Sequence, residues 1–267
     1  MSGLLRVGIL GATGRVGTLL LEEIATSTEL TLAAAITRST SNHLGTDVGE
    51  YLGRPKLGCT IQALTPQSFV GCDVVIDFSL PEGLQAALPH LGHCPLVSGT
   101  TGLDETTETA LARYATGAPV FTAANFSTGV HVLMTLVAQA AKALDDYEIE
   151  IIETHHRYKK DAPSGTALAL GRAAADARGH ALDAVVCTGR SGITDTRAPE
   201  TIGIHAIRMG QVVGEHTVSI ASDNEILTLG HAAQKRGAFA VGALRAARWL
   251  VAQPAGRYTM SDMLGLY

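Results

Sequence analysis

The residues best suited to chemistry lie in one short stretch near the middle of the chain. Residues 153–167 read E-T-H-H-R-Y-K-K-D-A-P-S-G-T-A and bring two histidines, an arginine and two lysines just ahead of a Pro-Ser-Gly-Thr sequence. That sequence is typical of a helix start, where free N–H groups and the positive end of the helix dipole favour anions. The stretch therefore predicts a site that holds a carboxylate or phosphate and delivers protons to it.

Two elements must position this stretch. Residues 148–152 alternate charged and apolar side chains, which predicts a strand, and residues 166–178 are rich in alanine, which predicts a helix. His155 and His156 follow the predicted strand closely, so at least one imidazole should face packed structure. A solvated cluster of surface charges is the alternative. The apolar strand and the accessible small residues at the helix start favour the functional interpretation.

A second set of chemical residues lies near the N-terminus. Residues 5–10 form a short apolar run, typical of a buried parallel strand, and residues 18–25 have a helical pattern. The glycines between them have the spacing G-x-x-G-x-x-G of a dinucleotide-binding turn. Gly11 permits a tight turn, Gly14 lets the backbone approach a pyrophosphate, and Gly17 permits close helix–strand contact. An ordinary glycine-rich turn is the alternative.

The end of the next predicted strand, residues 30–36, bears on the choice of cofactor. Thr37 stands where an NAD site usually has an acidic residue for the ribose 2′-hydroxyl. Arg38 follows, and a guanidinium can bind a phosphate through two parallel hydrogen bonds. The pair predicts that NADPH is accepted together with NADH, at least as well as NADH. An incidental surface arginine is the alternative for Arg38.

Further candidates follow the other strands of the first half. Predicted strands at residues 73–78, 95–98 and 120–123 alternate with helices, which indicates a parallel sheet. Ligands of such sheets bind beyond the carboxyl ends of the strands, where small and polar residues with an aromatic side chain suit ribose and nicotinamide. The predicted cofactor-binding residues are Gly11, Ala12, Thr13, Gly14, Arg15, Val16, Thr37, Arg38, Phe78, Gly99, Thr100, Thr101, Ala123, Ala124, Asn125 and Phe126.

The pattern changes in the second half of the chain. A hairpin turn is predicted at residues 208–211, a mobile loop at 189–200, and a helix at 238–252 that packs back on the nucleotide-binding domain. Four segments are predicted strands of an antiparallel or mixed sheet, namely residues 185–188, 202–208, 211–220 and 225–231.

These patterns predict an α/β protein with two domains. Residues 1–126 and 236–267 should form a Rossmann-type nucleotide-binding domain, and residues 127–235 an inserted α+β domain for substrate binding and tetramerisation. The uncharged stretch at residues 114–141 contains Gly, Pro, Asn and Ser, so it does not predict a membrane span. A helix at residues 128–144 is apolar on nearly every side and should be covered by a sheet or a partner subunit.

Composition narrows the possible partners. The chain has 267 residues and a net charge of −5, which argues against nucleic acid or an anionic membrane as a partner. The cysteines Cys59, Cys72, Cys94 and Cys187 have no C-x-x-C spacing, so neither a metal site nor a redox pair is expected. Reduced cysteines and the absence of a signal peptide predict a cytoplasmic location.

The stretch at residues 153–167 resembles the signature of the 4-hydroxy-tetrahydrodipicolinate reductases, or dihydrodipicolinate reductases, of lysine and diaminopimelate biosynthesis. The pattern E-x-H-H-x-x-K-x-D-A-P-S-G-T-A is long and specific, and the resemblance covers essentially the whole chain. Thr37 departs from the acidic residue of several members, which puts a strong NADH preference in doubt. Other matching segments are residues 11–17, 99–102, 123–126, 203–208 and 213–216.

The resemblance implies an NAD(P)H-dependent reductase of a cyclic, imine-derived dicarboxylate, with loss of water and tetrahydrodipicolinate as the product. It implies His155 as the proton donor or acceptor and Lys159 as a donor. It also implies a homotetramer built through the sheets of the inserted domain, and we expect hinges near Ser127 and residues 235–237. The substrate-binding residues that it implies are His156, Lys159, Ser164, Gly165 and Thr166.

Other functions remain open at this point. A semialdehyde dehydrogenase acting through a thioester would need a reactive cysteine beside a histidine, and only Cys94 precedes a strand at the predicted cofactor edge. Another NAD(P)-dependent imine oxidoreductase is a further alternative. A non-catalytic dinucleotide sensor would have no need for His155, Lys159 and the helix start together.

Overall fold

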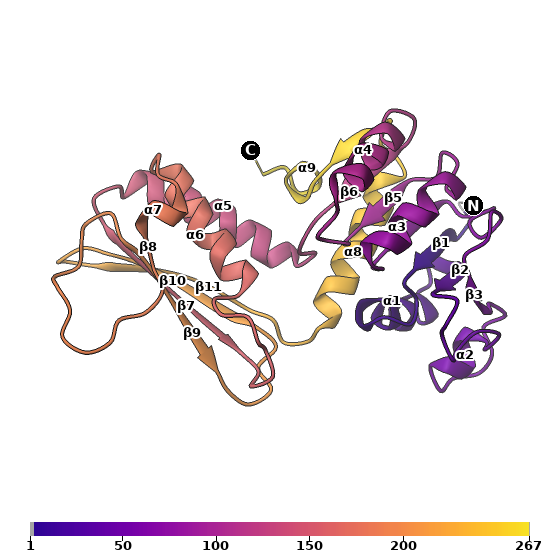
Figure 1. Cartoon of the computed structure of the whole chain (residues 1–267), viewed down its shortest axis with the longest axis horizontal. Helices are drawn as coiled ribbons and strands as arrows, with labels where there is room; N and C mark the ends of the chain where they lie inside the picture. Colours follow the sequence, from indigo (N-terminus) through magenta and orange to yellow (C-terminus); the bar gives the residue numbers. More distant parts are fainter. Residues whose placement is uncertain (1–2, 267) are drawn as a thin grey trace. The chain divides into compact units, whose positions relative to one another are not determined.

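The computed structural model describes residues 3–266, which form two compact units. The first unit combines the chain up to Phe126 with Gly237–Gly265, and the second unit is Ser127–Arg236. Figure 1 shows the elements of both units along the chain. Each unit has its own sheet and its own hydrophobic core, so each is described by itself.

Strands and helices alternate through the first unit. Its strands are β1 (Leu5–Leu10), β2 (Leu30–Thr37), β3 (Ile61–Ala63), β4 (Val74–Asp77), β5 (Leu96–Ser98), β6 (Pro119–Thr122) and β12 (Gly256–Tyr258). Its helices are α1 (Arg15–Ala25), α2 (Val48–Tyr51), α3 (Pro81–Ala87), α4 (Glu105–Tyr114), α8 (Gly237–Leu250) and α9 (Met260–Leu264), with a 3-10 turn, η1, at Leu88–His90.

The sheet of the first unit is parallel throughout and has the order β12-β6-β5-β4-β1-β2-β3. Buried side chains alternate between two cores along β4, with Val74 and Ile76 in one core and Val75 in the other. Helices α1 and α8 contribute to the first core, and α3 and α4 to the second. Burial on both faces explains why these strands are continuous apolar runs.

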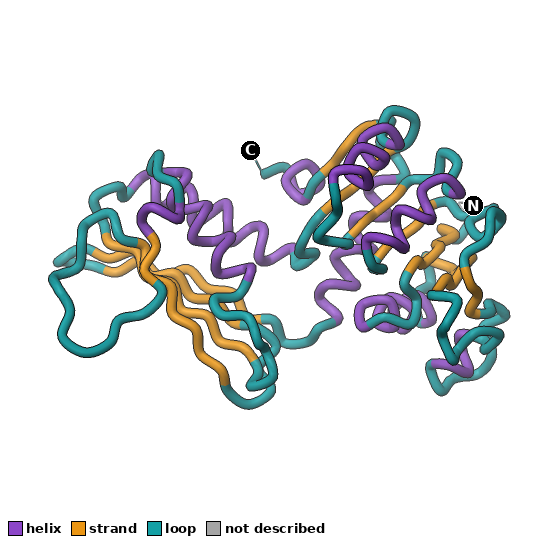
Figure 2. Tube along the Cα trace, in the orientation of Figure 1, coloured by secondary structure: helices purple, strands orange, loops and turns teal. Residues whose placement is uncertain are grey.

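The second unit is built on a mixed sheet of order β11-β10-β7-β9-β8. Figure 2 shows α5 and α6 together on one face of this sheet, and their apolar side chains form one core with it. The elements are α5 (Thr128–Ala143), β7 (Glu148–His155), α6 (Gly165–Ala177), α7 (Leu182–Val185), β8 (Val186–Cys187), β9 (Ile202–Arg208), β10 (Glu215–Ala221) and β11 (Ile226–Ala232). Across residues 3–266, no helix is both long and apolar enough to cross a membrane.

The end of β7 differs from the sequence prediction. The predicted strand ends at residue 152, but β7 continues to His155 because it pairs with a neighbour on each side. It runs parallel to β9 as far as His155 and antiparallel to β10 as far as Thr154. Since side chains alternate along a strand, Glu153 and His155 lie on the same face as the buried Ile151. This is the face covered by α5 and α6.

The predicted hairpin at residues 208–211 is wrong. Strands β9 and β10 are not neighbours, because β7 lies between them and pairs with both. The connection passes over the end of β7, where Met209 N donates to His155 O at 2.9 Å and Arg157 N donates to Gly210 O at 3.3 Å. Strand β10 accordingly begins at Glu215, four residues later than predicted. Turn residues show that a chain reverses but do not show which strand it pairs with.

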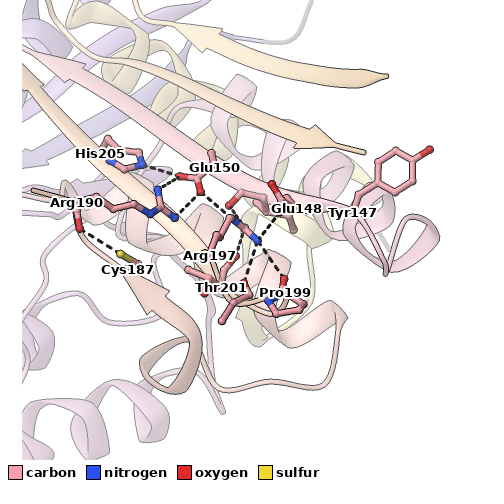
Figure 3. Close-up of polar contacts among 12 residues, drawn as sticks. Tyr147, Glu148, Glu150, Cys187, Arg190, Arg197, Pro199, Thr201 and His205 are labelled. Carbon is pink, nitrogen blue, oxygen red and sulfur yellow. Dashed lines mark hydrogen bonds and ion pairs between the residues drawn. The ribbon is translucent and has the colours of Figure 1, made fainter. Parts of the chain in front are cut away.

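The segment predicted as a loop at residues 189–200 has no helix or strand, and two of its arginines bind the open face of the sheet. Figure 3 shows Arg190, Arg197 and His205 around Glu150. Glu150 accepts from Arg190 at 2.8 Å, from His205 at 2.7 Å and from Arg197 at 3.2 Å. Burial raises the pKa of Glu150, but these hydrogen bonds outweigh it and lower the pKa to about 2. Val185, predicted in a strand, ends the short helix α7.

Candidate functional site

The glycine turn of the first unit has the geometry that its spacing predicts. Gly11 has a φ of 83°, and a Cβ there would lie 2.5 Å from the Phe78 carbonyl oxygen. A Cβ on Gly17 would lie 2.1 Å from the Gly11 carbonyl oxygen. Helix α1 begins at Arg15, three residues earlier than predicted, and Gly14 at its N-cap has no side chain to bind the first turn. The first-turn N–H groups can therefore bind an anion.

The turn is fastened to the end of β2. Ala12 N donates to Ile36 O at 2.9 Å, and the hydroxyls of Thr13 and Thr37 form a hydrogen bond of 2.6 Å. Thr37 is only 8% exposed, whereas Arg38 is exposed. The Thr37 hydroxyl therefore helps to hold the glycine turn, and Arg38 is the neighbouring group that can meet a phosphate.

A buried carboxylate ties together the loops after β4 and β5. Asp77 is fully buried and accepts from Ser79 N at 2.9 Å, Ser79 Oγ at 2.6 Å, Ser98 Oγ at 2.7 Å and Thr100 Oγ1 at 2.7 Å. Burial raises the pKa of Asp77 despite these hydrogen bonds. Because two loops share one carboxylate, Asp77 sets the distance between them.

The aromatic residues at this edge have different positions. The rings of Phe78 and Phe126 are 5.2 Å apart, and a Cβ on Gly99 would lie 2.3 Å from the Phe78 ring. Phe126 is only 1% exposed and packs in the core, so its ring is not available to a cofactor. Any cofactor contact by Phe126 must come from its backbone. In the same loop Ala124 is exposed, and its neighbours Ala123 and Asn125 are partly exposed.

Several predicted residues line one cleft of about 210 Å³ in the first unit. They come from the start of α1 and from the loops after β4 and β5, which lie at the carboxyl ends of neighbouring strands. The glycines without room for a side chain and the uncapped helix start fit a dinucleotide. The lining residues are Arg15, Val16, Phe78, Ser79, Leu80, Pro81, Gly99, Thr100 and Thr101.

The second unit gathers its chemical residues around Glu153, which is fully buried. Its Oε2 accepts from His155 Nδ1 at 2.6 Å and from Arg208 Nη1 at 2.8 Å. Its Oε1 accepts from Arg208 Nη2 at 2.7 Å and from Ser164 N at 2.9 Å. Burial raises the pKa of Glu153, but the bonds from Arg208, His155 and Ser164 outweigh it and lower the pKa. One carboxylate therefore joins His155 to the start of α6.

The start of α6 agrees with the prediction to within one residue. Ser164 is the N-cap, 2% exposed, and its Oγ accepts from Ala167 N at 3.2 Å. The same hydroxyl is 3.2 Å from His216 Nε2, so its hydrogen bonds are made inside the protein. Gly165 is exposed and Thr166 partly exposed at the first turn. Of the three predicted small residues, Gly165 and Thr166 are thus the accessible ones.

A second histidine packs against the first. The rings of His155 and His216 meet edge to face with centroids 5.3 Å apart. Burial, and then the nearby His155, lowers the pKa of His216 to about 4. His216 therefore stays neutral near pH 7.

The loop between β7 and α6 carries the remaining predicted residues. His156 Nδ1 is buried and has no hydrogen-bond partner within the described part of the chain, which fits a site that receives a polar ligand. Lys159 Nζ contacts both carboxylate oxygens of the exposed Asp161, at 2.9 and 2.8 Å. Arg157 and Lys160 are exposed, as expected for residues without an assigned role.

Sequence reasoning assigned no role to several of these residues. Glu153 opens the motif, and the same-face alternation would have placed it beside His155 had the strand been extended. Asp77 is an acidic residue in an apolar run, which is a visible signal. Arg208 and His216 reach Glu153 and His155 through the order of the strands, so no local pattern could identify them. No three His, Cys, Asp or Glu side chains within residues 3–266 form a metal-binding group.

Known proteins resemble the chain over its whole length. A 4-hydroxy-tetrahydrodipicolinate reductase of Halorhodospira halophila is 48% identical over 266 residues, which cover 98% of this chain and 99% of the relative. One from Psychrobacter arcticus is 43% identical over 268 residues, 98% of this chain and 96% of the relative. The solved dipicolinate-bound dihydrodipicolinate reductase of Paenisporosarcina sp. TG-14 has the same fold, with a TM-score of 0.76 at 21% identity, covering 97% of this chain and 99% of that one.

Family models agree with these relatives on both halves of the chain. The model for the N-terminus of dihydrodipicolinate reductase matches residues 5–126, which include the glycine turn and the cleft described above. The model for the C-terminus of the same enzyme matches residues 129–264, which include Glu153, His155 and Lys159. With both models matched in order, the chain belongs to the dihydrodipicolinate reductase family.

Proposed function

We propose that this chain reduces 4-hydroxy-tetrahydrodipicolinate to tetrahydrodipicolinate in lysine and diaminopimelate biosynthesis, with NADPH or NADH as the reductant. Two electrons and a proton enter as a hydride, one further proton is taken up, and the hydroxyl leaves as water. The observation that carries the proposal is the Glu153 carboxylate, which brings the imidazole of His155 and the first turn of α6 together. A proton donor thereby lies beside an anion-binding helix start.

The substrate is a dicarboxylate, and the second unit offers groups that suit it. The first turn of α6 at Gly165 and Thr166 binds one carboxylate, and the buried Nδ1 of His156 can donate to the substrate. Lys159 supplies a cation once it leaves Asp161. Ser164 contributes by capping the helix and holding its first turn in place.

Proton delivery is the task of His155 and Lys159. Hydride addition to a conjugated C=N or C=C system leaves an electron pair on the ring that an acid must protonate. His155 donates this proton, and Lys159 stabilises the developing negative charge and serves as a second donor. His155 ends β7 and Lys159 follows in the loop to α6, so the two groups are close in sequence and can serve a single bound substrate.

The cofactor binds the first unit at the carboxyl edge of the parallel sheet. The glycine turn and the start of α1 hold the pyrophosphate, Arg38 meets the 2′-phosphate of NADPH, and the loops after β4, β5 and β6 receive the ribose and nicotinamide. When bound, the dinucleotide supplies the hydride. Since Thr37 adds no negative charge, NADPH is used at least as well as NADH.

An oxidation assay tests the proposed function. Freshly generated 4-hydroxy-tetrahydrodipicolinate is added to the chain with NADPH or NADH, and the loss of the reduced cofactor is followed. We expect turnover with both cofactors and an equal or higher kcat/KM for NADPH. Absence of turnover with either cofactor would refute the activity. A variant with His155→Ala provides the control for oxidation that does not depend on the site.

Covalent thioester chemistry, the main alternative, finds no suitable thiol among the three cysteines of the first unit. Burial raises the pKa of the Cys72 thiol to about 11 and that of Cys94 to about 12. Burial also raises the pKa of Cys59. A nucleophilic cysteine needs a lowered pKa, so these residues have the character of structural thiols.

We also propose that the chain forms a homotetramer through the sheet of the second unit. Ile152 (43% exposed), Ile207 (43%) and Ile226 (67%) lie on the face opposite α5 and α6, as their pairing in register indicates. A sheet face with this much exposed apolar surface favours a partner. Light scattering at micromolar concentration should give a tetramer, and a monomer would refute the assembly.

The predicted cofactor residues belong to the first unit and the predicted substrate residues to the second. We propose that the chain crossings near Ser127 and at residues 235–237 act as hinges that let the nucleotide-binding unit close on the substrate during turnover. Small-angle scattering of the free chain and of the chain with both cofactor and dipicolinate tests this. Identical profiles would contradict it.

A further inference from the structure

The Glu153 carboxylate of the second unit has its acceptor positions filled by hydrogen bonds from within the protein. A carboxylate has about four acceptor positions, and within the described residues Glu153 accepts four hydrogen bonds. They come from β7 through His155, from β9 through Arg208 and from α6 through Ser164. The carboxylate therefore cannot rotate without breaking contacts to three elements, and its Oε2 is a fixed point 2.6 Å from His155 Nδ1.

This fixed carboxylate determines the protonation of the imidazole. Burial raises the pKa of Glu153, but the bonds from Arg208, His155 and Ser164 N lower it overall, so Glu153 is ionised near neutral pH. An ionised carboxylate only accepts hydrogen bonds, so Nδ1 of His155 must carry a proton. Nε2 is then the nitrogen that can exchange a proton with a substrate.

A glycine stands next to Nε2 of His155. Gly214 lies beside it, and a Cβ on this residue would lie 3.0 Å from Nε2, closer than ordinary contact. The ring of His216, which is neutral, packs edge to face against that of His155, while the nearby cations Lys159 and Arg208 are paired with Asp161 and Glu153. A side chain at position 214 would thus cover Nε2, the nitrogen that can exchange a proton with the substrate.

We propose that Glu153 is a positioning residue for the proton donor, holding His155 with Nδ1 protonated so that Nε2 alone serves the substrate. The proposal rests on the proposed role of His155. With Nε2 also protonated, the imidazolium lies against the Glu153 carboxylate. When Nε2 gives its proton to the ring of the substrate, the neutral imidazole keeps its Nδ1 proton and its hydrogen bond, so the ring does not turn.

Nitrogen-15 NMR of the histidines in the wild-type chain tests the protonation directly. The His155 signals are assigned by their loss in His155→Gln. At a pH where His155 is neutral we expect the Nδ1–H form with an unprotonated Nε2. A dominant Nε2–H form would overturn the proposal. This measurement needs neither substrate nor turnover, so it stands even if the proposed activity fails.

Steady-state kinetics of Glu153→Gln test the consequence. The variant keeps the size of the side chain but not its charge, and we expect kcat to fall about 10–100-fold with an unchanged KM for NADPH. The matched control is Glu150→Gln, the same substitution on the opposite face of β7, where the carboxylate accepts from Arg190, Arg197 and His205, and its kcat should stay within about threefold. Equal losses in both variants would make Glu153 merely structural. If the wild-type chain is active and Glu153→Gln has the same kcat, the positioning role is refuted while the proposed function stands.

A glycine substitution serves if Glu153→Gln does not fold. Gly214→Ala leaves the hydrogen bonds of Glu153 in place but sets a methyl group against His155 Nε2. We expect kcat to fall about tenfold or more. Gly230→Ala is the control, because its Cβ would make an ordinary contact, 3.6 Å from His216 O. Full activity of folded Gly214→Ala would show that Nε2 is not the working nitrogen and overturn the proposal.

Discussion

The two units each bury one carboxylate completely, and they satisfy it in opposite ways. Asp77 in the first unit accepts only from neutral groups, namely hydroxyls and a backbone N–H. Glu153 in the second unit accepts from the guanidinium of Arg208 and from an imidazole as well as from a backbone N–H. Burial therefore raises the pKa of Asp77, whereas the charged partners lower that of Glu153.

The difference matches what each unit must do. Asp77 fastens two loops that receive a cofactor, and neutral donors do this without adding a cation beside the site. Glu153 holds a residue whose charge changes during the reaction, and a carboxylate that stays ionised can stabilise the charged form. A buried carboxylate can therefore serve as a structural clamp or as a partner in proton transfer, depending on its donors.

The largest expected effect is on the unfolding free energy, when the charge of each buried carboxylate is removed in a separate variant. Glu153→Gln leaves the Arg208 guanidinium without its buried partner, and breaking such a pair costs about 3–5 kcal/mol of unfolding free energy. Asp77→Asn loses hydrogen bonds from neutral donors and should cost about 1–3 kcal/mol. Urea unfolding of both variants measures this. Equal costs would show that the nature of the donors does not matter.

Substitution of the proposed proton donors in the second unit should lower turnover without weakening cofactor binding. His155→Ala and Lys159→Ala should each lower kcat about 10²-fold or more, the usual effect of a positioned acid. The Kd for NADPH should change little, because both residues belong to the second unit. Stopped-flow turnover and fluorescence titration of NADPH measure the two quantities. Arg157→Ala, exposed in the same loop, is the control and should keep its turnover. Near wild-type turnover in either test variant would remove its assigned role.

The cation of the cofactor site can be tested in the same manner. Arg38→Ala should weaken NADPH binding by about 1.5–3 kcal/mol, the range for a hydrogen bond to a charged group, and leave NADH nearly unaffected. Calorimetric titration with both cofactors measures this. Arg113→Ala, an exposed arginine at the end of α4, is the control. Equal losses for both cofactors would mean that Arg38 does not contact the 2′-phosphate.

The smallest expected effect is on how the unfolding free energy varies with pH, and it should have opposite signs in the two variants. Glu153 has a folded pKa below its ordinary 4.5, so its stabilisation is present above about pH 4.5 and is lost as the pH falls through the folded value. Asp77 has a folded pKa above its ordinary 3.8, so the folded chain takes up that proton first and gains relative stability as the pH falls. Between pH 3 and 6, unfolding free energy should rise less steeply with pH in Glu153→Gln and more steeply in Asp77→Asn. Slopes that change in the same direction would contradict the comparison.

Local patterns were enough to predict the parts of the fold that depend on neighbours in sequence. Strand β1 has the predicted bounds, Leu5–Leu10, and α6 starts within one residue of the prediction. An apolar run followed by Gly11 admits few backbone paths, because a positive φ and close contact with Phe78 exclude other residues. The family signature located His155 by its type and spacing, since a motif is itself a local pattern.

Long-range pairing could not be predicted from the same patterns. The turn around Gly210 has the composition of a hairpin, yet β10 pairs with β7, which precedes it by about sixty residues. The groups around His155 depend on this choice, because Arg208 and His216 reach it only when β7 lies between β9 and β10. The local sequence motif was therefore enough to identify the candidate site. The charged groups around it depend on the order of the strands, which the motif does not show.

The alternation of side chains along β7 determines which mutations the protein can accept during evolution. Odd-numbered positions, including Ile151, Glu153 and His155, face the helices and the chemistry, while even-numbered positions such as Glu150 and Ile152 face the other way. Substitutions at even positions change the face of the sheet that points away from the proton donor. Loss of a single residue earlier in the strand would exchange the two sets, so β7 tolerates replacement far better than insertion or deletion.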